Sequence, residues 1–238
     1  MKLKLAHLLC LFPWLANAQF NLQQHYDLGR QIQTTTAEFF NVSNKNVTFA
    51  FMDINYDHRH FDKKGATDLW YELAWYHSIP LLDGKLNASI QYNDGIYFFP
   101  ADSTTLYSAV HSAWLAGISY PFQIGEYVIP VDLLLRQQEG DNNLTYQITV
   151  IWFLSLNQRF TLLGNLDFWT NASGPTWSIQ AEPQFLVNFG NAGIGLEMEI
   201  SRAFPGAWTT SKEYFDAAGN PREKDWWFIP TLFIKYTF

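Results

Sequence analysis

The chain ends in the segment TLFIKYTF (residues 231–238), in which two kinds of side chain alternate strictly. Successive side chains of an extended strand point to opposite faces. Leu232, Ile234, Tyr236 and the terminal Phe238 therefore share one apolar face. The segment predicts a β-strand that presents this face to an apolar environment.

The same period of two recurs through almost the whole chain. Many of the alternating segments run for about 10 to 15 residues, whereas strands of globular proteins cluster near five or six and membrane-spanning strands need about 9 to 11. The length therefore favours spanning strands. About twelve segments are expected, at 20–29, 31–41, 46–57, 68–78, 84–93, 104–120, 125–138, 143–155, 158–170, 175–189, 192–204 and 226–238.

A soluble β-sandwich would show the same alternation, so three further features decide between the two. Aromatic residues lie toward segment ends, as in a membrane-interface girdle. Short connections alternate with longer ones along most of the chain. The last strand resembles the C-terminal signal that the barrel-assembly machinery reads, through Phe238, in bacterial outer-membrane proteins. We therefore expect an all-β fold, a transmembrane antiparallel up-and-down β-barrel of about twelve strands. It would cover residues 19–238 and contact outer-membrane lipid, with both termini in the periplasm.

The N-terminal residues predict a signal peptide over residues 1–18. Lys2 and Lys4 precede an apolar stretch, and Ala16-Asn17-Ala18 forms a small-residue cleavage site. The only cysteine, Cys10, lies within this segment. The net charge of −7 argues against nucleic acid as a partner, because binding phosphates requires a basic surface.

Charged side chains predict which face lines the barrel interior, because a charge that faces hydrocarbon is costly. The inward register contains eight acids and three bases. Besides the candidates given below, this set includes Asp27, Lys85 and Lys235. An acidic lining favours cations, although a narrow barrel also needs polar side chains simply to fill its interior. Asp132 and Arg136 could form such a structural pair. The candidate lumen or solute-binding residues are Asp53, Glu72, Asp132, Arg136, Asp167, Glu182, Gln184, Glu197, Glu199, Phe51 and Trp70.

Several strand fragments resemble an uncharacterised Gram-negative outer-membrane family that is similar to Tsx-like nucleoside-specific channels. The fragments are 26–29, 34–40, 51–56, 181–185 and 229–238. The resemblance covers nearly all of the chain after the signal peptide. It implies a twelve-stranded barrel with a narrow, aromatic-lined channel for nucleosides. Glu182-Pro183-Gln184-Phe185 is similar to a Glu-Pro-Arg-Phe segment of the true channels, with Gln184 in place of the arginine.

Catalytic and metal-binding alternatives have weaker support. A lipid hydrolase of the barrel wall needs a histidine and a serine on adjacent strands, whereas the consecutive His111 and Ser112 face opposite ways. His58 and His60 could hold a metal, but Arg59 lies between them in an expected outer loop. We therefore expect no catalytic site, metal or cofactor.

Together these features predict a passive outer-membrane channel for small polar solutes, with nucleosides as the class implied by the resemblance. Two alternatives remain open. One is an outer-membrane enzyme that modifies lipid, and the other is a closed structural or adhesive barrel that acts through its 204–226 loop.

Overall fold

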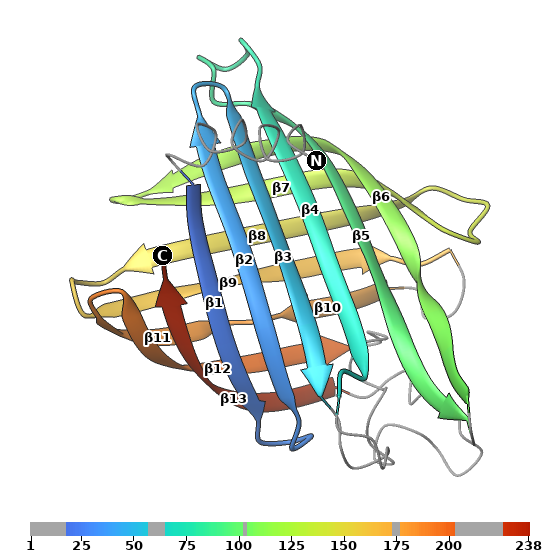
Figure 1. The fold of residues 1–238 in the computed structure, drawn as a ribbon. Coiled ribbons are helices and arrows are strands. Elements are labelled where there is room, and N and C mark those ends of the chain that lie inside the picture. Colours follow the sequence, from blue (N-terminus) through green and yellow to red (C-terminus); the bar gives the residue numbers. More distant parts are fainter. Residues whose placement is uncertain (1–17, 57–64, 102–103, 173–176, 203–225) are drawn as a thin grey trace, which may run out of the picture.

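The strands of the chain form one closed sheet. The computed structural model describes residues 18–56, 65–101, 104–172, 177–202 and 226–238, with the backbone alone for 97–101 and 104–111. These residues contain thirteen strands, all paired antiparallel, and β1 pairs with β13 to close the barrel (Figure 1). The strands are β1 (Ala18–Asp27), β2 (Gln33–Ser43), β3 (Asn46–Tyr56), β4 (Asp68–Ser78), β5 (Asn87–Ala101), β6 (Thr104–Ile124), β7 (Tyr127–Gln138), β8 (Thr145–Ser155), β9 (Phe160–Thr170), β10 (Trp177–Ala181), β11 (Gln184–Phe189), β12 (Ala192–Arg202) and β13 (Trp226–Thr237).

Strands β10 and β11 occupy a single position in the barrel wall. Both pair with β9 and β12 in one continuous register, and only Glu182 and Pro183 separate them. Pro183 has no N–H to donate to the ladder. Opposite this break, Gly164 leaves room for the carbonyl oxygen of Glu182, which a Cβ at that position would strike. The barrel therefore has twelve spanning segments, and the expected all-β barrel is confirmed.

The prediction for the fifth segment, 84–93, was wrong at both ends. Lys85 lies exposed in the turn before β5, where Leu82, Asp83 and Gly84 have positive φ angles, and so it does not face the interior as expected. β5 continues to Ala101, and in place of the long connection expected near 93–104 only residues 102–103 separate it from β6. A β-bulge between Asn93 and Gly95 interrupts the alternation there, which hid the second half of the strand.

The two ends of the barrel differ in their connections. One end carries the start of β1 and the end of β13, and the N–H of Phe238 donates to the carbonyl of Phe20 at 2.9 Å. We call this end the terminal rim and the opposite end the loop rim. Tight turns close the terminal rim, where Gly125 and Gly190 adopt φ angles of 61° and 68° that favour glycine. The loop rim carries the longer connections, among them 57–67 and 203–225.

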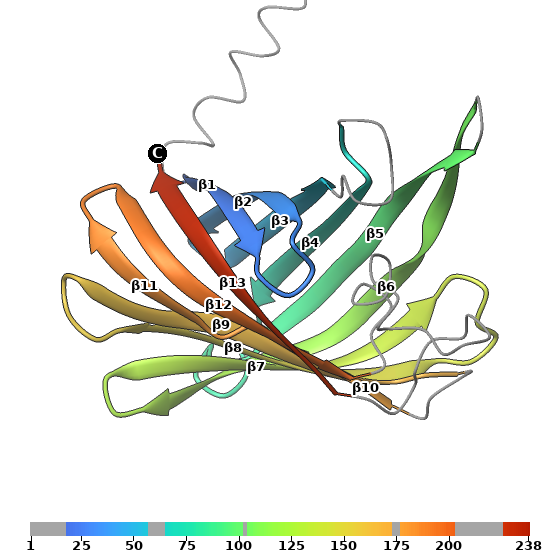
Figure 2. The ribbon, with the colours of Figure 1, turned by 90° about the horizontal axis from the view of Figure 1, so that it is seen from below.

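Burial in the barrel is reversed relative to a soluble protein. On β7 the side chain of Asp132 is fully buried, whereas its neighbour Leu133 is 52% exposed. β12 repeats the pattern, with Ser201 buried and Leu196 exposed. Viewed from below, β2 to β4 face β7 to β9 across the interior (Figure 2). A polar interior inside an apolar outer wall defines an outer-membrane barrel, and the chain is located in the bacterial outer membrane.

Within the described residues, no helix has both the length and the apolar character needed to cross a membrane. The proposed signal peptide lies outside the described residues except for Ala18, where β1 begins. The His58 and His60 cluster and nearly all of the 204–226 loop also lie outside them.

Candidate functional site

The strand register places all of the sequence-predicted lumen residues on the inner wall. Phe51, for example, lies opposite Glu38 on β2 and Glu72 on β4, and directly opposite residues of paired strands point to the same face. The carboxylates on this wall outnumber its bases, Arg30, Arg136 and Lys235, among the residues with described side chains. They are Asp27, Glu38, Asp53, Asp68, Glu72, Asp132, Asp167, Glu182, Glu197 and Glu199.

An arginine from the loop rim folds into the barrel. Arg30 lies in the turn between β1 and β2, and its guanidinium donates to the carboxylate of Asp27 at the end of β1. A second nitrogen, Nη2, donates to Glu199 Oε2 on β12 at 2.7 Å. Only 15% of the Arg30 side chain is exposed. The turn is thereby attached to the opposite side of the β1–β13 seam.

A second ion pair lies closer to the terminal rim. Lys235 Nζ of β13 and Asn21 Nδ2 of β1 each donate to Glu38 Oε2 at 3.1 Å. The register of the 31–41 segment could not be assigned from its sequence, so Glu38 was missing from the predicted inward set. Its pairing with Asn21 on β1 resolves the register. Two of the three inward bases are therefore already matched to acids.

Asp132 is held by residues from distant strands. Tyr76 of β4 donates its hydroxyl to Asp132 Oδ2 at 2.8 Å, and Gln91 Nε2 of β5 donates to the same oxygen at 2.8 Å. The expected pairing with Arg136 is wrong, because four residues along a strand span roughly 13 Å. Arg136 instead donates to Gln147 and Gln138.

Two acids lie beside the break between β10 and β11. Glu182 accepts a hydrogen bond from Gln180 Nε2 at 2.6 Å, and Glu197 of β12 accepts one from Gln184 Nε2. Glu197 lies directly opposite Gln184, which is two residues after Glu182. His25 Nδ1 lies 3.8 Å from Glu197 Oε1. Each of these two acids thus accepts a hydrogen bond from a neutral amide.

Both sides of the inner wall carry carboxylates. Glu72 of β4 accepts a hydrogen bond from Trp70 Nε1 at 3.0 Å. Asp167 accepts hydrogen bonds from Asn165 Nδ2 at 2.8 Å and from Gln147 Nε2 at 3.1 Å. The centre of the interior is therefore acidic on both sides.

The acids do not converge on a point. Among the residues that the structure describes, no three acidic, histidine or cysteine side chains are grouped closely enough to hold a metal ion. An acidic interior without a metal-like cluster can still attract cations along its length.

The outer wall contains one carboxylate that the sequence argument did not anticipate. Asp94 lies at the bulge of β5 on the outward register. It accepts hydrogen bonds from Tyr71 at 3.1 Å, from Tyr92 at 2.8 Å and from the N–H of Gly95 at 2.7 Å. These donors offset the cost of an outward charge. Charge alone is therefore not a complete guide to which face lines the interior.

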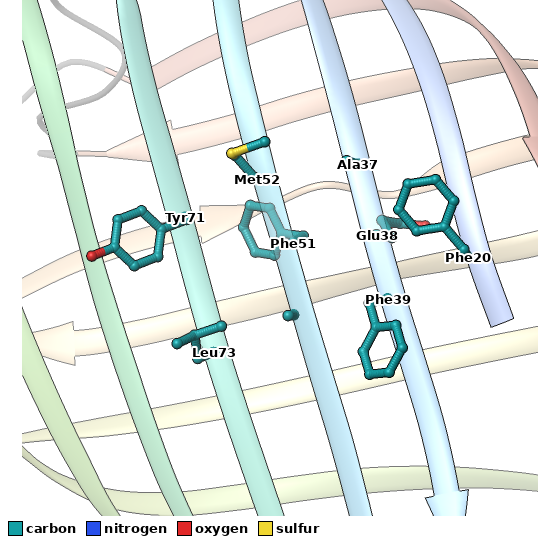
Figure 3. A pocket seen from close by; sticks show the side chains of 9 residues that line it. Phe20, Ala37, Glu38, Phe39, Phe51, Met52, Tyr71 and Leu73 are labelled. Carbon is teal, nitrogen blue, oxygen red and sulfur yellow. The ribbon is translucent and has the colours of Figure 1, made fainter. Parts of the chain in front are cut away.

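The outer wall also has a shallow apolar hollow of about 340 Å³ over β1 to β4. Ala37 and Ala50 leave space between the larger side chains of Phe39, Tyr71 and Leu73, which border the hollow (Figure 3). The hollow lies on the outward side of these strands, and Glu38 and Phe51, which belong to the inward register, also border it.

The barrel and its polar interior define the class as an outer-membrane β-barrel protein. The chain belongs to a family described as a domain of unknown function (DUF5020), whose model matches residues 18–238. A search of curated proteins finds no match.

Several solved outer-membrane barrels are similar to the chain in fold, at low identity. The translocator domain of autotransporter NalP from Neisseria meningitidis is 10% identical over 99% of this chain and 95% of its own, with a TM-score of 0.45. The outer-membrane channel DcaP of Acinetobacter baumannii is 8% identical over 93% and 96%, with a TM-score of 0.43. Omp33 of the same organism is 12% identical over 93% and 98%, with a TM-score of 0.40.

Proposed function

We propose that this barrel is a passive channel through which small polar solutes diffuse across the outer membrane. The observation that carries the proposal is the inner wall, where polar and acidic side chains continue from the loop rim to the terminal rim. Asp27 and Glu199 lie toward the loop rim, Glu38 and Glu72 lie in one row near the middle of the wall, and Lys235 lies toward the terminal rim. Such a wall supplies hydrogen-bonding partners along the path of a polar solute.

Within this proposal, nucleosides are the finer solute class. Their support is the resemblance of strand fragments to Tsx-like channels and the inward aromatic residues Phe51 and Trp70. A flat ring beside carboxylates and amides can stack on a base while the polar groups bind its edge. Gln184 donates its amide to Glu197, so it is part of the same polar lining.

Liposome swelling tests the channel directly. The purified full chain is reconstituted, and the entry of a nucleoside is compared with that of a disaccharide and with protein-free vesicles. Rapid nucleoside entry with slow disaccharide entry supports a narrow channel, and equal entry of both supports a channel without nucleoside preference. If protein that is shown to be folded admits neither solute, the channel proposal is wrong.

A closed structural or adhesive barrel is the second candidate, and the packing of the interior favours it. Asp132 and Ser201 are fully buried, and Gln23, Ser178 and Ser119 are at most 3% exposed. Interior side chains that exclude solvent so completely also serve a barrel that conducts nothing. The absence of swelling would point to this candidate.

A lipid-modifying enzyme remains a third possibility from the sequence. The histidines whose side chains the structure describes, His25 and His77, hydrogen-bond to Gln23 and Asn46. Asn46 could orient His77 on the outer wall, but a hydrolase also needs a serine bonded to the other ring nitrogen. Hydrolysis of a radiolabelled phospholipid by the wild type, lost in His77→Ala, would establish this activity.

We also propose that outer-membrane lipid surrounds the exposed apolar wall and that the barrel-assembly machinery reads β13. In support, Phe238 packs its ring against Phe20 and Tyr236 with centroids 5.6 and 4.9 Å away, and it remains 68% exposed. The aromatic ring is therefore accessible at the edge of the wall.

A further inference from the structure

One row of inward side chains crosses five neighbouring strands near the middle of the wall. Asn21, Glu38, Phe51, Glu72 and Asn93 follow one another from β1 to β5 as directly opposite residues. They therefore point to the same side of the sheet and lie next to one another. In this row the aromatic ring of Phe51 has a carboxylate on each side.

The two carboxylates of the row differ in what they bind. Glu38 is matched by Lys235, as described above. Glu72 accepts a hydrogen bond from the neutral indole of Trp70. Among the residues whose side chains the structure describes, no ion pair joins Glu72 to a base, and Arg136 on the facing wall donates to Gln147 and Gln138. Asp53 lies directly opposite Trp70 on the neighbouring strand, so a second carboxylate shares this side of the sheet with Glu72.

Asn93 provides an independent indication of a ligand. Its side chain is 95% buried, since only 5% is exposed, and its Oδ1 has no hydrogen-bond partner in the protein. Asn93 lies directly beside Glu72. A carboxylate and an unsatisfied amide oxygen are both hydrogen-bond acceptors, so a ligand that binds both must donate hydrogen bonds. An ammonium group supplies three N–H donors and a positive charge.

The neighbouring side chains favour an ammonium group attached to an apolar body. The ring of Phe51 lies on the other side of Glu72, where its face can attract a cation. Phe49 packs 5.9 Å from Phe51, and Phe40 lies beside Phe49 toward the terminal rim with 40% of its surface exposed. These three residues form an apolar part of the inner wall, on the terminal-rim side of the row that holds the acids.

We infer that Glu72, Asn93 and Phe51 form a binding site for an organic monocation, a primary ammonium next to an aromatic or aliphatic body. This inference rests on the proposed channel function and narrows its solutes.

Calorimetric titration of the folded full chain in detergent micelles tests the site without requiring conduction. Phenethylammonium is compared with phenylacetate, which has a similar body and the opposite charge, and heats from protein-free micelles are subtracted. We expect phenethylammonium to bind at least about tenfold more tightly than phenylacetate. Equal binding of the two ions, or binding of neither, overturns the inference.

Variants locate the site. Glu72→Gln removes the charge and keeps the shape, and it should weaken phenethylammonium binding by about tenfold. Phe51→Leu removes the ring and should weaken it by about threefold. Glu126→Gln makes the same charge change in an exposed turn and serves as the matched control. An affinity that Glu72→Gln or Phe51→Leu leaves at the control value overturns the assignment, and the second variant decides if the first does not fold.

Swelling and titration together separate the two proposals. Amine binding without entry of any solute contradicts the channel and keeps the site. Entry of solutes without a preference for the amine contradicts the site and keeps the channel.

Discussion

Arg30 in the β1–β2 turn and Glu199 on β12 are joined by a 2.7 Å hydrogen bond between Nη2 and Oε2, although 169 residues separate them in sequence. Their side chains are 15% and 8% exposed. Because β13 lies between β1 and β12, this contact spans the seam at which the barrel closes. It ties the first turn of the loop rim to the last strands of the chain.

Arg30→Ala should destabilise the folded barrel by on the order of 3 kcal/mol, because it leaves two buried carboxylates, Asp27 and Glu199, without their cation. Urea unfolding in lipid vesicles, followed by tryptophan fluorescence, measures the change. Arg159→Ala removes an exposed arginine from a turn at the terminal rim and should have little effect. The argument fails if the two variants lose the same stability.

Tyr76→Phe should cost about 1 to 3 kcal/mol of stability, because the buried carboxylate of Asp132 loses one of its donors while remaining fully buried. The same urea titration measures it. Tyr146→Phe is the control, since Tyr146 is 64% exposed on the outer wall. Since Asp132 does not pair with Arg136, the effects of Tyr76→Phe and Arg136→Gln should add, and strong non-additivity would contradict this assignment.

The barrel could be predicted from the sequence because its governing pattern is local. A period of two, segment length and the C-terminal strand depend on neighbouring residues. Together these three features predicted twelve spanning segments and placed Glu72, Asp167 and Glu197 on the inner wall. The pattern failed at Asn93 and Gly95, where a bulge changes the register, and at Lys85, which a turn with positive φ angles removes from the strand.

The partners of the interior residues could not be predicted in the same way. Tyr76 meets Asp132 across two intervening strands, and Arg30 reaches the interior from a turn that has no periodic signal. Glu38 lies in a segment rich in threonine, where both faces are similar and the register is ambiguous. These contacts depend on barrel closure and curvature, which no single strand encodes.

Gly117→Ala should destabilise the barrel by about 1 to 3 kcal/mol or prevent its folding. A Cβ at Gly117 on β6 would strike the carbonyl oxygen of Leu133 and lie 2.9 Å from Leu134 Cα. Both atoms belong to the backbone of β7, so the two strands would have to separate. Gly65→Ala is the control, because nothing lies within 4 Å of a Cβ there. The fraction of heat-modifiable folded protein on a gel measures the difference, and equal folded fractions would contradict the close approach of β6 and β7.

Glu182→Gln combined with Glu197→Gln should reduce the cation preference of the channel. Both carboxylates lie on the inward register beside the break between β10 and β11, and the amides that donate to them, Gln180 and Gln184, are neutral. Their field therefore acts on ions in the interior.

In planar bilayers under a potassium chloride gradient, we expect the wild-type reversal potential to lie on the cation side and the double variant to shift it toward zero. Glu126→Gln changes the charge of an exposed turn by the same amount per residue and should leave the potential within error of the wild type. A double variant that conducts with the wild-type reversal potential would show that these acids are structural, and that solute selection resides elsewhere on the inner wall.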